Sequence, residues 1–548
     1  MNLRQYIAAE RRVFHCGDLL RIVLELDAPQ AGRAFLRTTL GMVDIRYREL
    51  IDQVEHGKAI IGRDWQDLPM RRSGERSFEL LVPLLAVGSY EGKAFFQPEN
   101  SERIYWPAGE NLRFKVEPEV TVCANTLYTA FIRQFGPNLA DCQVTEEEKQ
   151  AMALLDRRQY TVIPAAGTFR NLIGRLDMII GELGSRIVQL LPIHPVPTTF
   201  ARMGRFGSPF AALDYFSVNP TFADFDRKRT PMEQFEELVD AVHLRGGLLF
   251  LDIPVNHTGW ASRLQLEHPD WFVRRDDGTL ESPGAWGVVW EDLCKLDYRR
   301  REVWRFMAEV FLFWCRRGVN GFRCDAGYML PAESWDYIVA KVRREFPATV
   351  FLLEGLGGPR DKQEQLLGRS DLNWAYSELF QNYSREQIEY YQPYIARCSA
   401  EYGLLVNYAE THDNNRLAVS GPVYASMRCA LCALLSEGGG FGITNGVEWF
   451  ATEKVDVHGD ASLNWGNPAN QVKGLRRLQT LLAEHAAFAA GNPARLVTRS
   501  RTAALAALRG DGDDKVLILI NLDCEKSTPV AWPVREFEAP EETALDLL

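Results

Sequence analysis

The stretch "NGFRCDAGYMLP", residues 320–331, holds an arginine and an aspartate two positions apart, just after an aromatic-rich helical run. If this stretch is a buried strand, both charges are unfavourable to bury unless they are paired or used in chemistry. Other strand-like runs also end in polar residues. These are Asp252, Asn256 and His257 in "LDIPVNH", Glu354 in "FLLEGLGG", and His412 and Asp413 in "ETHDNN". Any one of them has an equally good explanation as a structural charge, but the whole set favours an active site.

The chemistry that this set favours is glycoside cleavage with retention. One ionised carboxylate attacks the anomeric carbon, and a second carboxyl group about 5 Å away protonates the leaving oxygen. Arg323 would hold the neighbouring Asp325 as the anion, because arginine does not lose its proton. Glu354 has apolar neighbours and other carboxylates that would raise its pKa and suit it as the acid. A third carboxylate, Asp413, could hold sugar hydroxyls and favour an oxocarbenium-like transition state.

The middle of the chain must bring these residues together. Between about 120 and 488, eight apolar strand candidates alternate with segments of helical period. This pattern predicts a (β/α)8 barrel over residues 116–488, with an insertion at about 258–297 between the third strand and third helix. The carboxyl ends of all eight strands would then meet at one cleft. A doubly wound open sheet is the structural alternative, but no GxGxxG or Walker motif follows any strand.

The regions on either side of the barrel read as β-structure. Residues 1–115 alternate in short apolar runs punctuated by Gly, Pro and Asn, which predicts an antiparallel β-sandwich. Residues 489–548 contain "ALAALRG" and "KVLILINLD", which predict a second, smaller β domain. The fold class is therefore α/β, a TIM barrel with an insertion after its third strand and β domains at both ends.

Four motifs, "LDIPVNH", "GFRCDA", "FLLEGL" and "ETHDNN", resemble those of the α-amylase family and occur in that family's order. The resemblance implies Asp325 as nucleophile, Glu354 as general acid/base and Asp413 as transition-state stabiliser. Arg416, three residues after Asp413, would either pair with a cleft carboxylate or lie at the surface. The resemblance further implies three residues around the sugar that precedes the cleaved bond: Arg323, His257 and His412. The N-terminal and C-terminal regions also look like β domains that family members carry.

Some positions depart from the family pattern. In "SPFAALDYFSVNP", Phe210 stands where a sugar-stacking tyrosine is usual, so a ring face remains but the hydroxyl is lost. Ala211 follows where many members place Asp or Ser, which removes a polar contact. These changes leave the reaction class intact and leave linkage and chain-length preference open.

Asn256 is both a candidate substrate contact and the position from which some family members bind calcium. The insertion carries five acids, Asp270, Asp276, Asp277, Glu291 and Asp292. Clustered acids in a loop are usually solvated surface, and no EF-hand pattern is present. We therefore predict no cofactor and no metal, with Ca²⁺ kept as the alternative. Tryptophans that could serve as sugar platforms or pack the domains are Trp271, Trp286, Trp290 and, near the N-terminus, Trp106.

Composition excludes some partners. The net charge of −11 and pI near 5.5 argue against nucleic acid and against an anionic membrane surface. The N-terminus shows no secretory signal, and the most apolar run, "VFLFWC", is far too short to span a membrane. Ten cysteines without repeating spacing point to the cytoplasm. An oligosaccharide or α-glucan is the predicted partner, and the oligomeric state is undetermined.

Three reactions share this set of residues. Hydrolysis of α-1,4-glucosidic bonds in maltooligosaccharides or α-glucans, through a covalent glycosyl-Asp intermediate, is the leading hypothesis. A 4-α-glucanotransferase comes second, because the acceptor subsites are built from loops. A maltosyl- or glucosyltransferase that uses phosphate comes third, since no basic phosphate pocket is obvious. A non-catalytic glycan-binding barrel is disfavoured because all three acids are present.

Overall fold

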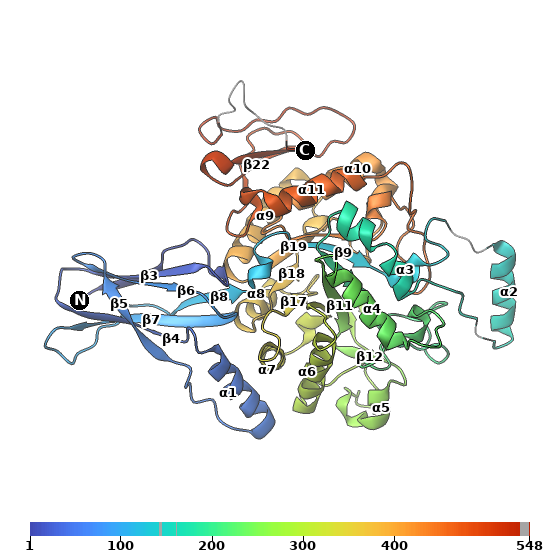
Figure 1. Ribbon diagram of the computed structural model, residues 1–548, viewed down its shortest axis with the longest axis horizontal. Coiled ribbons are helices and arrows are strands. Elements are labelled where there is room, and N and C mark those ends of the chain that lie inside the picture. Colours follow the sequence, from blue (N-terminus) through green and yellow to red (C-terminus); the bar gives the residue numbers. More distant parts are fainter. Residues whose placement is uncertain (142–144, 161, 538–546) are drawn as a thin grey trace.

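The computed structural model describes residues 1–141, 145–160, 162–537 and 547–548 (Figure 1). At its centre eight parallel strands form a closed barrel in the order β10-β11-β16-β17-β18-β19-β20-β9. The strands are β9 (Thr126–Ala130), β10 (Ile187–Leu190), β11 (Leu248–Pro254), β16 (Gly321–Asp325), β17 (Val350–Leu353), β18 (Trp374–Tyr376), β19 (Leu404–Tyr408) and β20 (Phe441–Thr444). Each lies in one of the eight predicted runs. The closed barrel confirms the predicted fold class and rules out the open sheet.

Helices cover the outside of the barrel, as the ring around the strands in Figure 1 shows. They are α3 (Phe169–Ile173), α4 (Pro231–His243), α6 (Arg301–Cys315), α7 (Ala332–Arg343), α8 (Arg360–Arg369), α9 (Arg385–Glu401), α10 (Pro422–Leu434) and α11 (Val472–Glu484). Local sequence sets their ends: α4, for example, begins with a capping box between Thr230 and Glu233, and Pro231 occupies its first turn. The strands are apolar on both faces because the helices bury one face and the barrel interior buries the other.

The segment between β11 and α6 is the predicted insertion. Strand β12 (His257–Gly259) pairs antiparallel with β15 (Leu293–Lys295), which ties both ends of the insertion to the mouth of the barrel. Between them lie the short helix α5 (Arg263–Glu267) and a hairpin of β13 (Gly284–Ala285) and β14 (Val288–Val289).

The N-terminal region forms a sheet with the order β1-β3-β6-β5-β4-β7-β8-β2. Its strands are β1 (Leu3–Ile7), β2 (Val13–His15), β3 (Leu19–Leu26), β4 (Gly32–Thr38), β5 (Gln66–Arg72), β6 (Ser77–Pro83), β7 (Gly88–Pro98) and β8 (Leu112–Glu117). Leu24 on β3, Phe96 on β7 and Val116 on β8 share one apolar core, so the sheet folds over itself. Strand β8 continues to Glu117, two residues past the predicted boundary.

A helix that the sequence analysis did not predict interrupts this sheet. Helix α1 (Val43–His56) connects β4 to β5, and its Tyr47, Ile51 and Val54 are buried in the core that includes the barrel. It packs against α7. The N-terminal region is therefore attached to the barrel through a helix as well as through its sheet.

The C-terminal region is a small antiparallel sheet of β21 (Arg495–Leu496), β22 (Ala504–Arg509) and β23 (Val516–Asn521), which lies beside α10 and α11 in Figure 1. Buried Arg509 donates to Glu437 at 3.0 Å and joins this sheet to the barrel. Residues 538–546 of the predicted domain lie outside the described residues. None of the helices in the described part of the chain combines the length and apolarity that crossing a bilayer requires.

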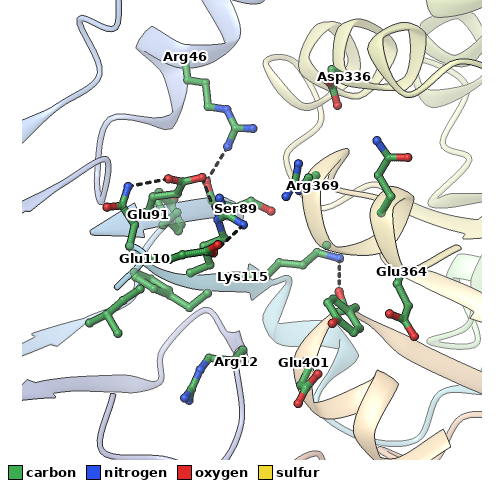
Figure 2. Close-up of a pocket in the computed structure, with 18 of the residues that line it drawn as sticks. Arg12, Arg46, Ser89, Glu91, Glu110, Lys115, Asp336, Glu364, Arg369 and Glu401 are labelled. Carbon is green, nitrogen blue, oxygen red and sulfur yellow. Dashed lines mark hydrogen bonds and ion pairs between the residues drawn. The ribbon is translucent and has the colours of Figure 1, made fainter. Parts of the chain in front are cut away.

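A cavity of about 910 Å³ separates β7 and β8 from helices α7, α8 and α9 (Figure 2). Its walls mix cations and anions, with Arg46 on the N-terminal side and Asp336 on the barrel side. Lys115 joins the two regions, because its Nζ donates to the carbonyls of Leu372 and, at 3.5 Å, Tyr402 on the barrel side. The same Nζ pairs with Glu117 on its own strand at 2.6 Å. None of the predicted catalytic residues lines this cavity.

Candidate active site

Arg323, on β16, is held by partners from three strands. Strands β11 and β16 pair so that Asp252 stands opposite Arg323. The Arg323 Nη1 group donates to Asp252 at 2.7 Å and to Asp325 at 2.8 Å, and its Nε donates to the Tyr376 hydroxyl on β18 at 3.0 Å. Arg323 is 2% exposed, and these partners compensate its buried charge. The expected contact between Arg323 and Asp325 is therefore present.

Glu354 follows β17 and accepts two backbone hydrogen bonds. The N–H of Ala326 donates to Oε2 and the N–H of Leu356 donates to Oε1, both at 3.0 Å. The pKa of Glu354 is raised to about 7, chiefly by burial; the charge of Arg323 opposes the shift and the charge of Asp325 adds to it. A carboxyl group with this pKa holds a proton near neutrality and can deliver it to a leaving group.

The peptide between these two carboxyl groups is strained. Ala326 has a φ of 52°, in the left-handed region that residues with a Cβ seldom adopt. The N–H of Ala326, immediately after Asp325 at the end of β16, donates to Glu354. Backbone strain of this kind persists where the surrounding structure determines it, and it concentrates at functional sites.

Two histidines border Asp325 and Asp413. His257, 1% exposed at the start of β12, has its Nε2 3.8 Å from Oδ2 of Asp325. Neither ring nitrogen of His257 has a hydrogen-bond partner among the described residues. His412 has its Nε2 3.4 Å from Oδ2 of Asp413, and burial lowers the pKa of both histidines. Both rings are therefore neutral near pH 7 and can hydrogen-bond to a sugar.

Asp413 differs from the other two acids in its exposure. Its side chain is 65% exposed on the loop after β19, whereas Asp325 is 14% exposed. Its N–H donates to Thr411 Oγ1 at 3.3 Å, which orients the loop. A carboxylate so placed can contact a sugar that enters the cleft from solvent.

Phe210, from the loop after β10, reaches the same site. Its ring lies nearly parallel to the ring of His412, with 5.6 Å between centroids and 18° between planes. The guanidinium carbon of Arg323 lies 5.9 Å from the Phe210 centroid. The residue that replaces the usual tyrosine therefore still offers a ring beside the histidine.

Comparisons with known proteins agree with this geometry. The family profile described as "Alpha amylase, catalytic domain" matches residues 143–349. An "Alpha-1,4-glucan:maltose-1-phosphate maltosyltransferase" of Cereibacter sphaeroides is 26% identical over 406 residues, which cover 68% of this chain and 58% of that protein. Residues 143–349 therefore resemble the α-amylase catalytic domain. A protein of the same description from Myxococcus xanthus is 26% identical over 478 residues, which cover 72% of this chain and 68% of that one.

Solved structures share the fold of this chain. An α-amylase from Lactobacillus plantarum superposes with a TM-score of 0.56 at 22% identity, covering 71% of this chain and 86% of that one. A cyclomaltodextrinase superposes with a TM-score of 0.58 at 16% identity, covering 94% of this chain and 91% of that one. At these identities the likeness concerns the fold. The chain spans little more than half the length of the Cereibacter relative.

Arg416 is buried within the protein. It is 3% exposed, and its Nη1 donates to Glu410 at 2.7 Å. Its Nη2 and Nε donate to the carbonyls of Asn445 at 2.9 Å and Glu453 at 3.0 Å. All three nitrogens of Arg416 are therefore engaged within the protein, and its ion-pair partner Glu410 is itself 2% exposed. A contact between Arg416 and substrate stays a prediction.

Asn256 is also engaged within the protein. Its Nδ2 contacts the sulfur of Met329 at 3.1 Å, and the residue is 2% exposed. Among the insertion acids, Asp270 pairs with Arg300 at 3.0 Å and Asp277 accepts from its neighbour Thr279. No group of three or more His, Cys, Asp or Glu side chains suited to a metal occurs in the described part of the chain. The described residues therefore offer no preformed cluster of carboxylates for calcium, and the absence of a metal stays a prediction.

The three tryptophans of the insertion have different surroundings. Trp271 stacks on His268 at 3.8 Å between centroids and packs within the core that includes the barrel. Trp290 lies 6.0 Å from the ring of His257. Trp286 is 69% exposed at the tip of the β13–β14 hairpin. Packing accounts for the position of Trp271, whereas Trp286 and Trp290 lie near the candidate active site.

The sequence analysis missed Tyr376. Its hydroxyl accepts from Arg323, and Gln189 on β10 donates to the same oxygen at 3.4 Å. Tyr408 on β19 donates to Oε1 of Gln189 at 3.0 Å, which links β10, β18 and β19 inside the barrel. The sequence signal for Tyr376 was its hydroxyl group within an otherwise apolar strand, because a buried polar group needs a hydrogen-bond partner.

Proposed function

We propose that this protein is a retaining glycoside hydrolase that cleaves α-1,4-glucosidic bonds in maltooligosaccharides or α-glucans. The observation that carries the proposal is a pair of carboxyl groups in different surroundings, one bonded to a guanidinium and the other buried after the neighbouring strand. Asp325 is bonded to the Arg323 guanidinium at 2.8 Å, and Glu354, whose pKa is raised to about 7, is bonded to the next peptide. One ionised and one protonated carboxyl group are what a double displacement requires.

In the first step, an oxygen of Asp325 bonds to the anomeric carbon as the glycosidic C–O bond breaks. Glu354 gives its proton to the departing sugar oxygen, and a glycosyl-Asp325 ester remains. In the second step, a water molecule gives a proton to Glu354 while its oxygen attacks the anomeric carbon, and Asp325 departs as the carboxylate. Both groups regain their starting states, and one water is consumed for each bond cleaved.

The surrounding residues supply binding and orientation. His257 and His412 are neutral and donate hydrogen bonds to the sugar ring, and Phe210 stacks against it. Asp413 holds hydroxyl groups and favours the positive charge that develops in the transition state. Arg323 is a positioning residue, because its bonds to Asp252 and Tyr376 fix the orientation in which it holds Asp325.

A second candidate is transfer of the glycosyl unit to another sugar in place of water. The observation that favours it is the name of the curated relatives, "Alpha-1,4-glucan:maltose-1-phosphate maltosyltransferase". The first step and its residues would be the same, and a sugar hydroxyl would replace water in the second. A 4-α-glucanotransferase and a maltosyltransferase both follow this course.

Net charge and free cysteines indicate the kind of partner and the cellular compartment that this proposal implies. The net charge of −11 favours a neutral oligosaccharide over nucleic acid. The nine cysteines among the described residues are all free thiols, which favours the cytoplasm in this proposal.

The test is product analysis by mass spectrometry after incubation with maltoheptaose, with and without added glucose, beside the Asp325→Asn variant. Shorter oligosaccharides with a matching gain in reducing ends support hydrolysis. Longer and shorter chains together, with no net gain in reducing ends, support transfer. Unchanged maltoheptaose, together with no reaction on α-maltosyl fluoride, would contradict both.

A further inference from the structure

A buried lysine, a buried glutamate and a buried asparagine meet where the N-terminal region contacts the barrel. Lys115 and Glu117 are two residues apart on β8, so their side chains point to the same face of the strand. Phe114 and Val116 point the other way, into the apolar core of the N-terminal sheet. Asn373 immediately precedes β18 of the barrel. Lys115, Glu117 and Asn373 are each no more than 2% exposed.

The carboxylate of Glu117 contacts both of the other groups. Its Oε1 lies 2.6 Å from Nζ of Lys115, and its Oε2 accepts a hydrogen bond from Nδ2 of Asn373. Nζ of Lys115 also donates to the carbonyl of Leu372, the residue that precedes Asn373. One carboxylate therefore holds the amine and the side-chain amide, and it can carry a proton from one nitrogen to the other.

The side-chain carbonyl of Asn373 is held by two further donors. Arg343 Nη2 donates to its Oδ1 at 2.7 Å, and the backbone N–H of Phe351 donates to the same oxygen at 2.9 Å. Donors so placed polarise the carbonyl and stabilise the negative charge that develops on Oδ1 when a nucleophile adds to Cγ. Burial requires only that these polar groups have partners. Here the partners also bring an amine, a proton carrier and an activated amide to one place.

We propose that the side chains of Lys115 and Asn373 are joined by an amide bond, with Glu117 as the proton carrier. Glu117 takes a proton from the Lys115 ammonium, and the neutral Nζ bonds to Cγ of Asn373. A second proton from Nζ passes to Nδ2, the Cγ–Nδ2 bond breaks, and ammonia departs. The ammonia carries away the proton on Glu117 as ammonium, so the carboxylate is restored. The reaction consumes no oxidant, reductant or other reactant.

The surroundings of the three side chains suit this reaction. Their burial keeps water away from Cγ of Asn373, where hydrolysis would compete with attack by the amine. Lys115 lines the cavity of about 910 Å³ between β8 and the barrel helices, which gives the ammonia a route to solvent (Figure 2). The bond also replaces a buried ammonium, which is unfavourable to bury, by a neutral amide.

The bond ties the N-terminal region to the barrel. Because it joins two residues that are far apart in the sequence, it restricts the unfolded chain as a long-range cross-link does. The nine cysteines among the described residues are all free thiols, so no disulfide between them serves this purpose. Unlike a disulfide, an amide bond does not need an oxidising compartment. The inference is independent of the proposed glycosidase reaction.

The test is the intact mass of the purified full chain under denaturing conditions. The expected mass is that of the sequence less one ammonia. A tryptic digest should contain residues 114–133 joined to residues 370–385, with no cleavage after Lys115. A mass equal to that of the sequence would overturn the proposal, as would a loss of ammonia with the two peptides found separate.

Two variants assign the roles of the residues. Lys115→Arg keeps a buried cation beside Glu117 but cannot attack, because arginine does not lose its proton. Glu117→Gln keeps the shape of the proton carrier and removes its charge. Each variant should have the full mass of its own sequence and separate peptides. Lys93→Arg, on the neighbouring strand β7, is the matched control and should retain the bond.

The wild-type mass decides whether the bond exists even if a variant does not fold. Complete bond formation in Glu117→Gln would overturn the assignment of Glu117 as the proton carrier. Loss of the bond in Lys93→Arg would overturn the assignment of Lys115 as the nucleophile.

Discussion

The backbone N–H of Ala326 donates to Oε2 of Glu354 at 3.0 Å, and Ala326 has a left-handed backbone conformation. This bond joins the residue next to Asp325, on β16, to the carboxyl group that follows β17. It orients Glu354 while leaving the acid able to keep its proton, since burial outweighs the effect of the bond on the pKa. The two carboxyl groups of the proposed reaction are thus held by one peptide.

Substitution of Ala326 tests the importance of this peptide. Ala326→Gly should fold normally and keep activity, because glycine adopts a positive φ without penalty. Ala326→Val should lower kcat at least tenfold and reduce the melting temperature, because a β-branched residue is disfavoured at that φ. Steady-state kinetics and thermal melts of both variants provide the comparison. Equal behaviour of the two would show that the backbone conformation is unimportant.

Variants of Asp325 and Glu354 should differ in their activity on donors that have different leaving groups. Asp325→Asn should lower activity by several orders of magnitude on every donor, because no bond to the anomeric carbon can form. Glu354→Gln should lower maltoheptaose cleavage by about 10²- to 10⁴-fold, the usual contribution of general acid catalysis. The same variant should still cleave α-maltosyl fluoride in its first step, because fluoride departs with little help from a proton. Near-normal maltoheptaose turnover in either variant would reject the assignment.

The pH dependence should report the proton on Glu354. Because burial raises its pKa to about 7, kcat/KM should fall as pH rises through about 7, where the acid form disappears. The measurement is a profile of kcat/KM between pH 5 and 9 on maltoheptaose. On α-maltosyl fluoride the alkaline fall should be much weaker, and an equally steep fall would assign that limb to another group.

Stability should change with pH at the same residue. The folded-state pKa of Glu354 lies above its ordinary value of 4.5, so its contribution to stability is present below about 4.5 and is lost as pH rises to about 7. Glu354→Gln lacks this change. The melting temperature of the variant relative to wild type should therefore be higher at pH 8 than at pH 5, and parallel curves would contradict the raised pKa.

The Arg416–Glu410 pair should matter for folding more than for binding. Arg416→Ala leaves Glu410 buried without its partner and should lower the free energy of unfolding by about 3–5 kcal/mol. The double variant Arg416→Met with Glu410→Leu should recover much of that loss, since it removes both charges. Urea unfolding measures the effect. A raised KM with unchanged stability would show that Arg416 contributes to substrate binding and not to folding.

Much of the barrel could be predicted from local sequence. Each strand is a short apolar run that ends in polar residues, and a segment of helical period follows it. The order of strands and helices can therefore be predicted from the sequence. Helix α1 was missed although Tyr47, Ile51 and Val54 have helical spacing, because the surrounding strands dominated the pattern. Its burial depends on α7, which lies far away in sequence.

The sequence by itself determined which residues could do chemistry. Arg323, Asp325 and Glu354 stand at strand ends, and parallel strands in a closed barrel bring those ends to one face. Only the tertiary structure decided which polar groups face each other. Arg416 pairs with Glu410 within the protein, and Arg323 donates to Tyr376 inside the barrel. The ring of Trp286 packs on the loop after Glu354. These contacts depend on the paths of loops and the directions of long side chains, which packing of the whole chain sets and no local pattern encodes.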